Sequence, residues 1–102
     1  MAYIDHYFEA LISAGASDLH LAEGQPPKIR RHGDIVAIHE DILTSDDMNY
    51  MLSEICQPKN WKRFQEKGDL DFAYEMSEDN RFRCNYFKQA HGIAAVFRII
   101  PT

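Results

Sequence analysis

The chain has 102 residues and a mass of 11.8 kDa; 45% of its residues are hydrophobic and 26% are charged. These values are typical of one small globular domain, and they exclude a disordered, collagen-like or low-complexity chain. The formal net charge of −5 argues against a nucleic-acid binder that acts alone, since such proteins neutralise phosphates with an excess of cations.

The first half of the chain predicts one helix followed by three short strands. Residues 3–14 place apolar side chains at helical spacing. These side chains are Ile4, Phe8, Leu11 and Ile12. Residues 18–22 alternate in polarity, and residues 28–31 and 35–39 predict two strands joined by a turn at 32–34.

The second half predicts two helices followed by three strands. Thr44 is a suitable cap for a helix whose buried face carries Met48, Met51, Leu52 and Ile55. A shorter helix begins at Pro58 and ends at Gly68. Alternating polarity predicts strands at residues 70–76, 81–86 and 93–100. The predicted fold is therefore α+β, in the order α-β-β-β-α-α-β-β-β, with two antiparallel meanders separated by helices.

The last predicted hairpin places two arginines directly opposite each other. Symmetric pairing about the turn at 90–91 sets Arg83 against Arg98, with Asn85 beside them opposite Val96. The same register gathers apolar residues on the other face, where Phe82, Cys84 and Tyr86 meet Ile99, Phe97 and Ala95. Like charges directly opposite destabilise a strand pair, so a negative group is expected near the two arginines.

Two negative groups are compatible with this arginine pair. A three-residue turn at 78–80 would pair Arg83 with Glu75, which gives an internal ion pair. The alternative is a bound anion, most simply phosphate, because guanidinium groups match phosphate oxygens. Glu75 neutralises one arginine at most, and both alternatives remain open at this point.

The chain carries few of the sequence patterns of a self-contained enzyme. It has no P-loop, no Gly-x-Ser-x-Gly and no His-Glu-x-x-His. Its histidines show no metal-ligand spacing, so no metal site is expected; they are His6, His20, His32, His39 and His91. Cys56 and Cys84 are too few for a secreted disulfide scaffold and are predicted to be small hydrophobic residues in a cytosolic protein. The N-terminus predicts no signal peptide.

Several segments together resemble a known family. They are Gly-Ala-Ser-Asp-Leu-His-Leu at 15–21, Gly-Gln-Pro-Pro at 24–27, Arg-His-Gly-Asp at 31–34, Arg-Phe-Arg-Cys-Asn-Tyr-Phe at 81–87 and Ala-Val-Phe-Arg-Ile-Ile-Pro at 95–101. In this order they resemble the N-terminal domain of type IV pilus retraction ATPases, the PilT-like branch of the secretion ATPase superfamily. The turn at 89–92 departs from the more polar or basic turn expected there.

The resemblance implies a PAS-like domain over residues 1–102, followed in the parent protein by a RecA-like motor domain that carries the P-loop. It implies a homo-hexamer in which motor domains of the same and neighbouring subunits are the partners. It also implies that Arg83 and Arg98 reach the terminal phosphate of ATP, which the motor domain binds with Mg²⁺. The expected location is the cytoplasm, at the inner membrane that holds the pilus machinery. ATP hydrolysis by this chain alone is not expected.

Two other functions are compatible with the same sequence. A stand-alone PAS-like domain could bind a small ligand in sensing or interaction, although no histidine or cysteine is suited to anchor haem or flavin. An adaptor could mediate oligomer contacts only, with both arginines paired internally. The oligomeric state of the isolated domain and the pilus system it serves stay open.

Overall fold

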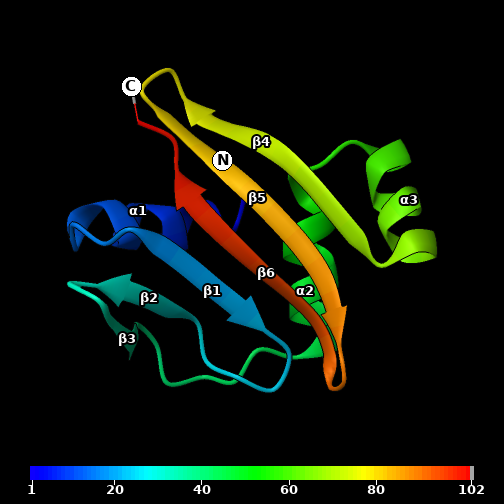
Figure 1. The fold of residues 1–102 in the computed structure, drawn as a ribbon, viewed down its shortest axis with the longest axis horizontal. Helices are drawn as coiled ribbons and strands as arrows, with labels where there is room; N and C mark the ends of the chain where they lie inside the picture. Colours follow the sequence, from blue (N-terminus) through cyan, green and yellow to red (C-terminus); the bar gives the residue numbers. More distant parts are fainter. Residues whose placement is uncertain (102) are drawn as a thin grey trace.

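A computed structural model describes residues 1–101 and has three helices and one six-stranded sheet (Figure 1). The helices are α1 (Asp5–Ser13), α2 (Ser45–Glu54) and α3 (Pro58–Lys67). The strands are β1 (Asp18–Ala22), β2 (Lys28–Arg31), β3 (Asp34–Ala37), β4 (Asp69–Ser77), β5 (Asn80–Gln89) and β6 (Gly92–Ile99). The predicted α+β class and element order are confirmed.

The two predicted meanders form a single antiparallel sheet. Its strand order is β3-β2-β1-β6-β5-β4, and the central pair, β1 with β6, joins the two meanders. In Figure 1, α1 and α2 lie behind the strands, whereas α3 lies beside the edge strand β4. One face of the sheet therefore packs on helices, and the other is turned toward the viewer.

The ends of the second and third helices follow from local chemistry. The Thr44 hydroxyl accepts from the backbone N–H of Asp47 at 3.1 Å, and the Asp47 carboxylate accepts from the Thr44 N–H at 2.9 Å. This reciprocal capping box confirms the predicted start of α2. Pro58 occupies the first turn of α3, and Gly68 ends that helix with a left-handed φ of 84°.

Two local predictions were wrong. Ile12 is 39% exposed, because the inward face of α1 is formed by Phe8 and Leu11. The third strand covers Asp34–Ala37 rather than 35–39. A two-residue turn lets β3 begin at Asp34, opposite Arg31, the last residue of β2. β3 ends at Ala37, opposite Lys28, because the residue before Lys28 is a proline, which has no N–H to continue the pairing.

The core lies between the sheet and its helices and is rich in aromatic rings. Phe8, Phe64, Phe82, Tyr86 and Phe97 are all fully buried. The Tyr86 hydroxyl donates to the carbonyl of Leu52 in α2 at 3.0 Å, so the polar end of this ring is satisfied. Side chains of the sheet and of all three helices contribute to one continuous cluster.

Cys84 lies within this core, where burial raises the pKa of its thiol to about 12. The thiol is therefore protonated at neutral pH, and Cys84 is a small buried residue of the core, as predicted. Within residues 1–101, none of the helices is long and apolar enough to cross a bilayer.

Candidate functional site

The strand registers place a row of charged residues across four adjacent strands, β2, β1, β6 and β5. The strand registers place Asp18 of β1 between Arg30 of β2 and Arg98 of β6, and place Arg98 opposite Arg83 of β5. Three positive groups and one carboxylate therefore follow one another across the sheet. We call this set the charged row.

The predicted register of the last hairpin is confirmed residue by residue. Arg83 pairs with Arg98 and Asn85 pairs with Val96, while Cys84 pairs with Phe97 on the core face. The two arginines are exposed, and with Asn85, Val96 and Asp71 they line a pocket of about 290 Å³. We call this hollow the arginine pocket.

The predicted partner of Arg83 was wrong. Glu75 lies opposite Arg81, and Arg83 lies opposite Ala73. The cause is a two-residue turn, because Ser77 pairs with Asn80, together with an irregularity between Glu75 and Ser77; each shifts the register by one residue. Relative to the pairing expected with a three-residue turn, the partner of each β5 residue therefore lies two residues earlier in β4.

A different carboxylate lies near Arg83. Asp71 Oδ1 is 3.7 Å from Arg83 Nε, and the two side chains are 59% and 71% exposed. An ion pair this open to water is worth about 1 kcal/mol or less. Among residues 1–101, no ion pair includes Arg98. An incoming anion would therefore displace one weak contact and would find the second guanidinium free of a carboxylate.

Sequence reasoning missed Asp18, the carboxylate of the charged row. It is only 4% exposed, accepts a hydrogen bond from the Ser17 hydroxyl at 2.6 Å, and contacts Nε2 of His20. Arg30 Nε lies 3.7 Å away. Burial acts to raise the pKa of Asp18, but these hydrogen bonds and charges outweigh burial and lower the pKa below its ordinary value of 3.8.

The signal for Asp18 in the sequence was its alternation with Leu19, which places it on the same face as His20. His20 lies half-buried on that face. Only the pairing of β1 with β6 places Asp18 beside Arg98.

Asp18 should make the fold sensitive to acid. Because its pKa is lower in the folded chain than in the unfolded chain, the stabilisation it gives is present at neutral pH and disappears as pH falls below about 4. Urea unfolding followed by circular dichroism should show the free energy of unfolding nearly constant from about pH 5 to 7 and falling below about pH 4. Asp18→Asn should lower stability at pH 7 and flatten the acid decline. A variant as acid-sensitive as the unmodified chain would contradict this role.

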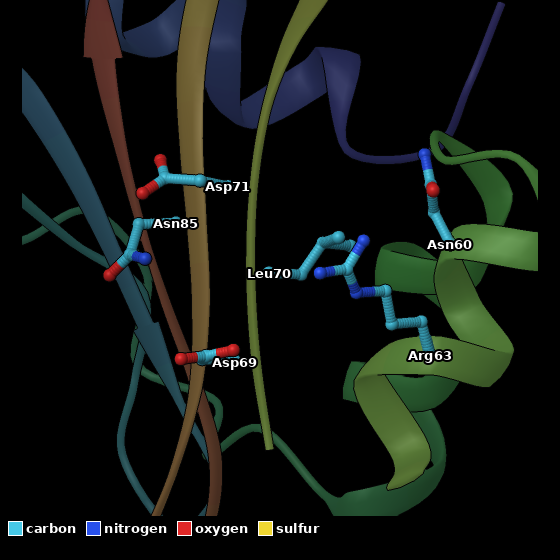
Figure 2. A pocket seen from close by; sticks show the side chains of 6 residues that line it. All are labelled: Asn60, Arg63, Asp69, Leu70, Asp71 and Asn85. Carbon is cyan, nitrogen blue, oxygen red and sulfur yellow. The ribbon is translucent and has the colours of Figure 1, made fainter. Parts of the chain in front are cut away.

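A second pocket, of about 330 Å³, adjoins the arginine pocket at the edge of the sheet (Figure 2). Asn60 and Arg63 line it from α3, and Arg63 extends toward β4, whereas Asp71 and Asn85 point to the other side of β4 and line both pockets. Polar and charged groups therefore continue from the charged row to the edge beside α3. Across residues 1–101 there is no group of three or more potential metal ligands.

Known proteins share both the sequence and the fold of this chain, although no family model matches it. The type IV pilus retraction ATPase PilT of Pseudomonas aeruginosa is 42% identical over 88 residues, which is 86% of this chain and 26% of that protein. A twitching motility protein of Neisseria gonorrhoeae is 34% identical over 76 residues, covering 74% of this chain and 20% of the relative. The crystal structure of the pilus retraction motor PilT with bound ADP superposes with a TM-score of 0.84 at 32% identity, covering 100% of this chain and 30% of that one.

The sequence and the fold both match the N-terminal domain of secretion ATPases. Within that superfamily the chain is a homologue of the type IV pilus retraction ATPases, the PilT-like branch. The resemblance found in the sequence motifs is thereby confirmed. The chain spans 26% of the length of the Pseudomonas aeruginosa protein and 20% of that of the Neisseria gonorrhoeae protein.

Proposed function

We propose that this chain is the N-terminal domain of a hexameric motor ATPase that retracts type IV pili in twitching motility. In this proposal a RecA-like motor domain follows residue 102 and holds ATP with Mg²⁺, while Arg83 and Arg98 contact the terminal phosphate. The observation that carries the proposal is the pair of exposed, directly opposed guanidinium groups in the arginine pocket.

The geometry of this pair is suited to phosphate. Guanidinium groups form forked, charge-assisted hydrogen bonds with phosphate oxygens, and two of them on neighbouring strands can act on one phosphate group. Charge spread over the transferred phosphoryl group would relieve the repulsion between Arg83 and Arg98. A motor domain closing on this face would bring nucleotide and arginines together only in the closed state, so that closure is coupled to ATP binding.

The proposed partners follow from the same arrangement. The helix-free face would contact the motor domain of its own subunit, and other surfaces of the domain would contact neighbouring subunits of the hexamer. The ADP bound by the related PilT motor supports nucleotide as the ligand. We place the assembled motor in the cytoplasm, peripheral to the inner membrane, where it would act on the pilus machinery.

The coding sequence beyond Thr102 tests this proposal most directly. We expect a continuous reading frame with a Gly-x-x-x-x-Gly-Lys-Ser/Thr segment, because the proposed motor domain needs a P-loop to hold the nucleotide phosphates. A stop codon immediately after Thr102 in the natural gene would overturn the motor function and favour a stand-alone binding domain.

A further inference from the structure

A pocket of about 320 Å³ lies on the helix side of the domain, away from the arginine pocket, and has no part in the proposed function. Three segments meet there: the start of α1, the loop before α2, and α2 itself. Its lining consists of Tyr3, His6, Tyr7, His39, Asp41, Ile42, Leu43 and Asp47. We call it the tyrosine pocket.

Large apolar side chains remain exposed around this pocket. Tyr3 is 52% exposed, Tyr50 is 61% exposed and Ile42 is 54% exposed. The ring of Tyr3 meets those of Tyr7 and Tyr50 edge to face, with centroids 6.3 and 6.4 Å apart. Single exposed hydrophobic residues are ordinary on a protein surface, but a contiguous group next to a hollow is typical of an interaction site.

The charge around these rings is negative. Asp41 and Asp47 line the pocket, and Glu54 accepts a hydrogen bond at 2.9 Å from the backbone N–H of Tyr3. The pKa of Tyr7 is raised, mainly by burial and also by Tyr3, Asp47 and Asp41. No lysine or arginine lines the tyrosine pocket among the described residues.

The carboxylates in the pocket retain capacity for a ligand. Asp47 uses Oδ2 to accept from the Thr44 N–H, which leaves its other oxygen for a new partner. The side chain of Asp41 is 89% exposed, and its carboxylate lies 3.5 Å from Nδ1 of His39, which accepts a hydrogen bond from the Asp41 backbone N–H. The pocket thus combines electron-rich ring faces with carboxylate oxygens, the combination that binds ammonium and guanidinium groups.

We propose that the tyrosine pocket binds a segment of a partner protein in which a lysine or arginine stands beside an apolar residue. The cation packs on the tyrosine rings and pairs with Asp41 or Asp47, and the apolar neighbour covers Ile42. Nucleic acids and anionic lipid surfaces are poor occupants, because their phosphates would be repelled by the same carboxylates. The site lies on the face opposite the arginine pocket, so it stands independently of the nucleotide role.

The test uses the isotope-labelled 102-residue chain and an octapeptide of alternating arginine and leucine. Titration followed by NMR should shift the resonances of Tyr3, Tyr7 and Ile42 and give a measurable Kd. An octapeptide of alternating glutamate and leucine should not bind, and one of alternating arginine and serine should bind at least about threefold more weakly.

Two variants locate the interaction on the chain. Tyr3→Ala should raise the Kd about fivefold, which is the loss of one cation–aromatic contact. Asp41→Asn should raise the Kd by a similar factor, and because the Asp41 side chain is 89% exposed, this substitution should leave the fold intact. Asp79→Asn is the matched control, since it removes the same charge from the distant turn between β4 and β5.

Three outcomes would overturn the proposal. The first is the absence of shifts in the tyrosine pocket at millimolar peptide. The second is equal binding of the arginine–serine peptide, which would remove the apolar contribution. The third is an equal loss of affinity in Asp79→Asn and Asp41→Asn, which would mean that the peptide responds to the net charge of the domain and not to the tyrosine pocket.

Discussion

In the proposed motor ATPase, replacing Arg98 by alanine is expected to lower kcat for ATP hydrolysis about 100-fold, the usual effect of removing one charge-stabilising donor. Arg98 is exposed beside Arg83, and no ion pair within residues 1–101 includes it, so its charge is available to the nucleotide. The loss should appear in kcat more than in KM, because the phosphoryl charge that Arg98 is proposed to neutralise is largest in the transition state. Steady-state phosphate release by the purified hexamer is the measurement.

Two controls separate this role from a general effect on the domain. Arg98→Lys keeps the charge but loses the forked geometry of the guanidinium group. Its kcat should therefore lie between that of the unmodified protein and that of Arg98→Ala. Arg81→Ala removes a charge two residues from Arg83 on β5, outside the lining of the arginine pocket, and should change kcat less than about threefold. An assembled Arg98→Ala hexamer with unchanged turnover would exclude Arg98 from catalysis.

Replacing Phe8 by alanine is expected to lower the free energy of unfolding by about 3–5 kcal/mol, the usual cost of removing a buried phenylalanine ring. Phe8 is fully buried and joins α1 to the sheet. Its ring stacks on Phe82 with a centroid distance of 4.0 Å and meets Phe97 edge to face at 5.2 Å. Truncation therefore leaves a cavity between α1 and two strands that rigid neighbouring rings cannot close.

The matched control for Phe8 lies on the same helix. Ile12 is 39% exposed, so Ile12→Ala should cost less than about 1 kcal/mol even though it also removes an apolar side chain from α1. Urea denaturation of the two variants measures the difference. Equal losses would mean that α1 is held by its general hydrophobicity rather than by the ring cluster around Phe8.

Much of the fold could be predicted from the sequence, because its signals are local. Alternating polarity predicts the long strands, and Thr44, Pro58 and Gly68 predict where helices begin or end. The register of β5 with β6 could be predicted as well, since only one alignment gathers the apolar residues on one face. For these strands, helix ends and this register, the local sequence pattern was therefore sufficient to predict the structure.

The remainder depends on contacts or turns that local patterns do not specify. Pairing of β1 with β6 brings Asp18 opposite Arg98, two residues that are distant along the chain. The register of β4 with β5 was wrong because Ser77, Glu78, Asp79 and Asn80 are compatible with turns of two or three residues. The structure has the shorter turn, which shifts the register by one residue, and the irregularity between Glu75 and Ser77 shifts it by one more. Asp71 is therefore the carboxylate near Arg83 in place of Glu75.

The candidate site shows the same division. Arg83 and Arg98 could be predicted as a facing pair, because both lie on one hairpin. The expectation that they bind phosphate depended on the family resemblance. The two facing positive charges alone were equally compatible with a neighbouring carboxylate of the chain. Asp18 and Arg30, which complete the charged row, come from strands that join this hairpin only in the folded chain.

The edge strand β4 has a consequence for the behaviour of the domain in solution. It is nine residues long, and its outer backbone groups could pair with another copy. Asp69, Asp71 and Glu75 all lie on one face of this edge and are exposed. A second β4 brought alongside would set these carboxylates against identical ones, and the repulsion opposes edge-to-edge aggregation. The carboxylates of β4 thus oppose growth of the sheet at the longer of its two edge strands.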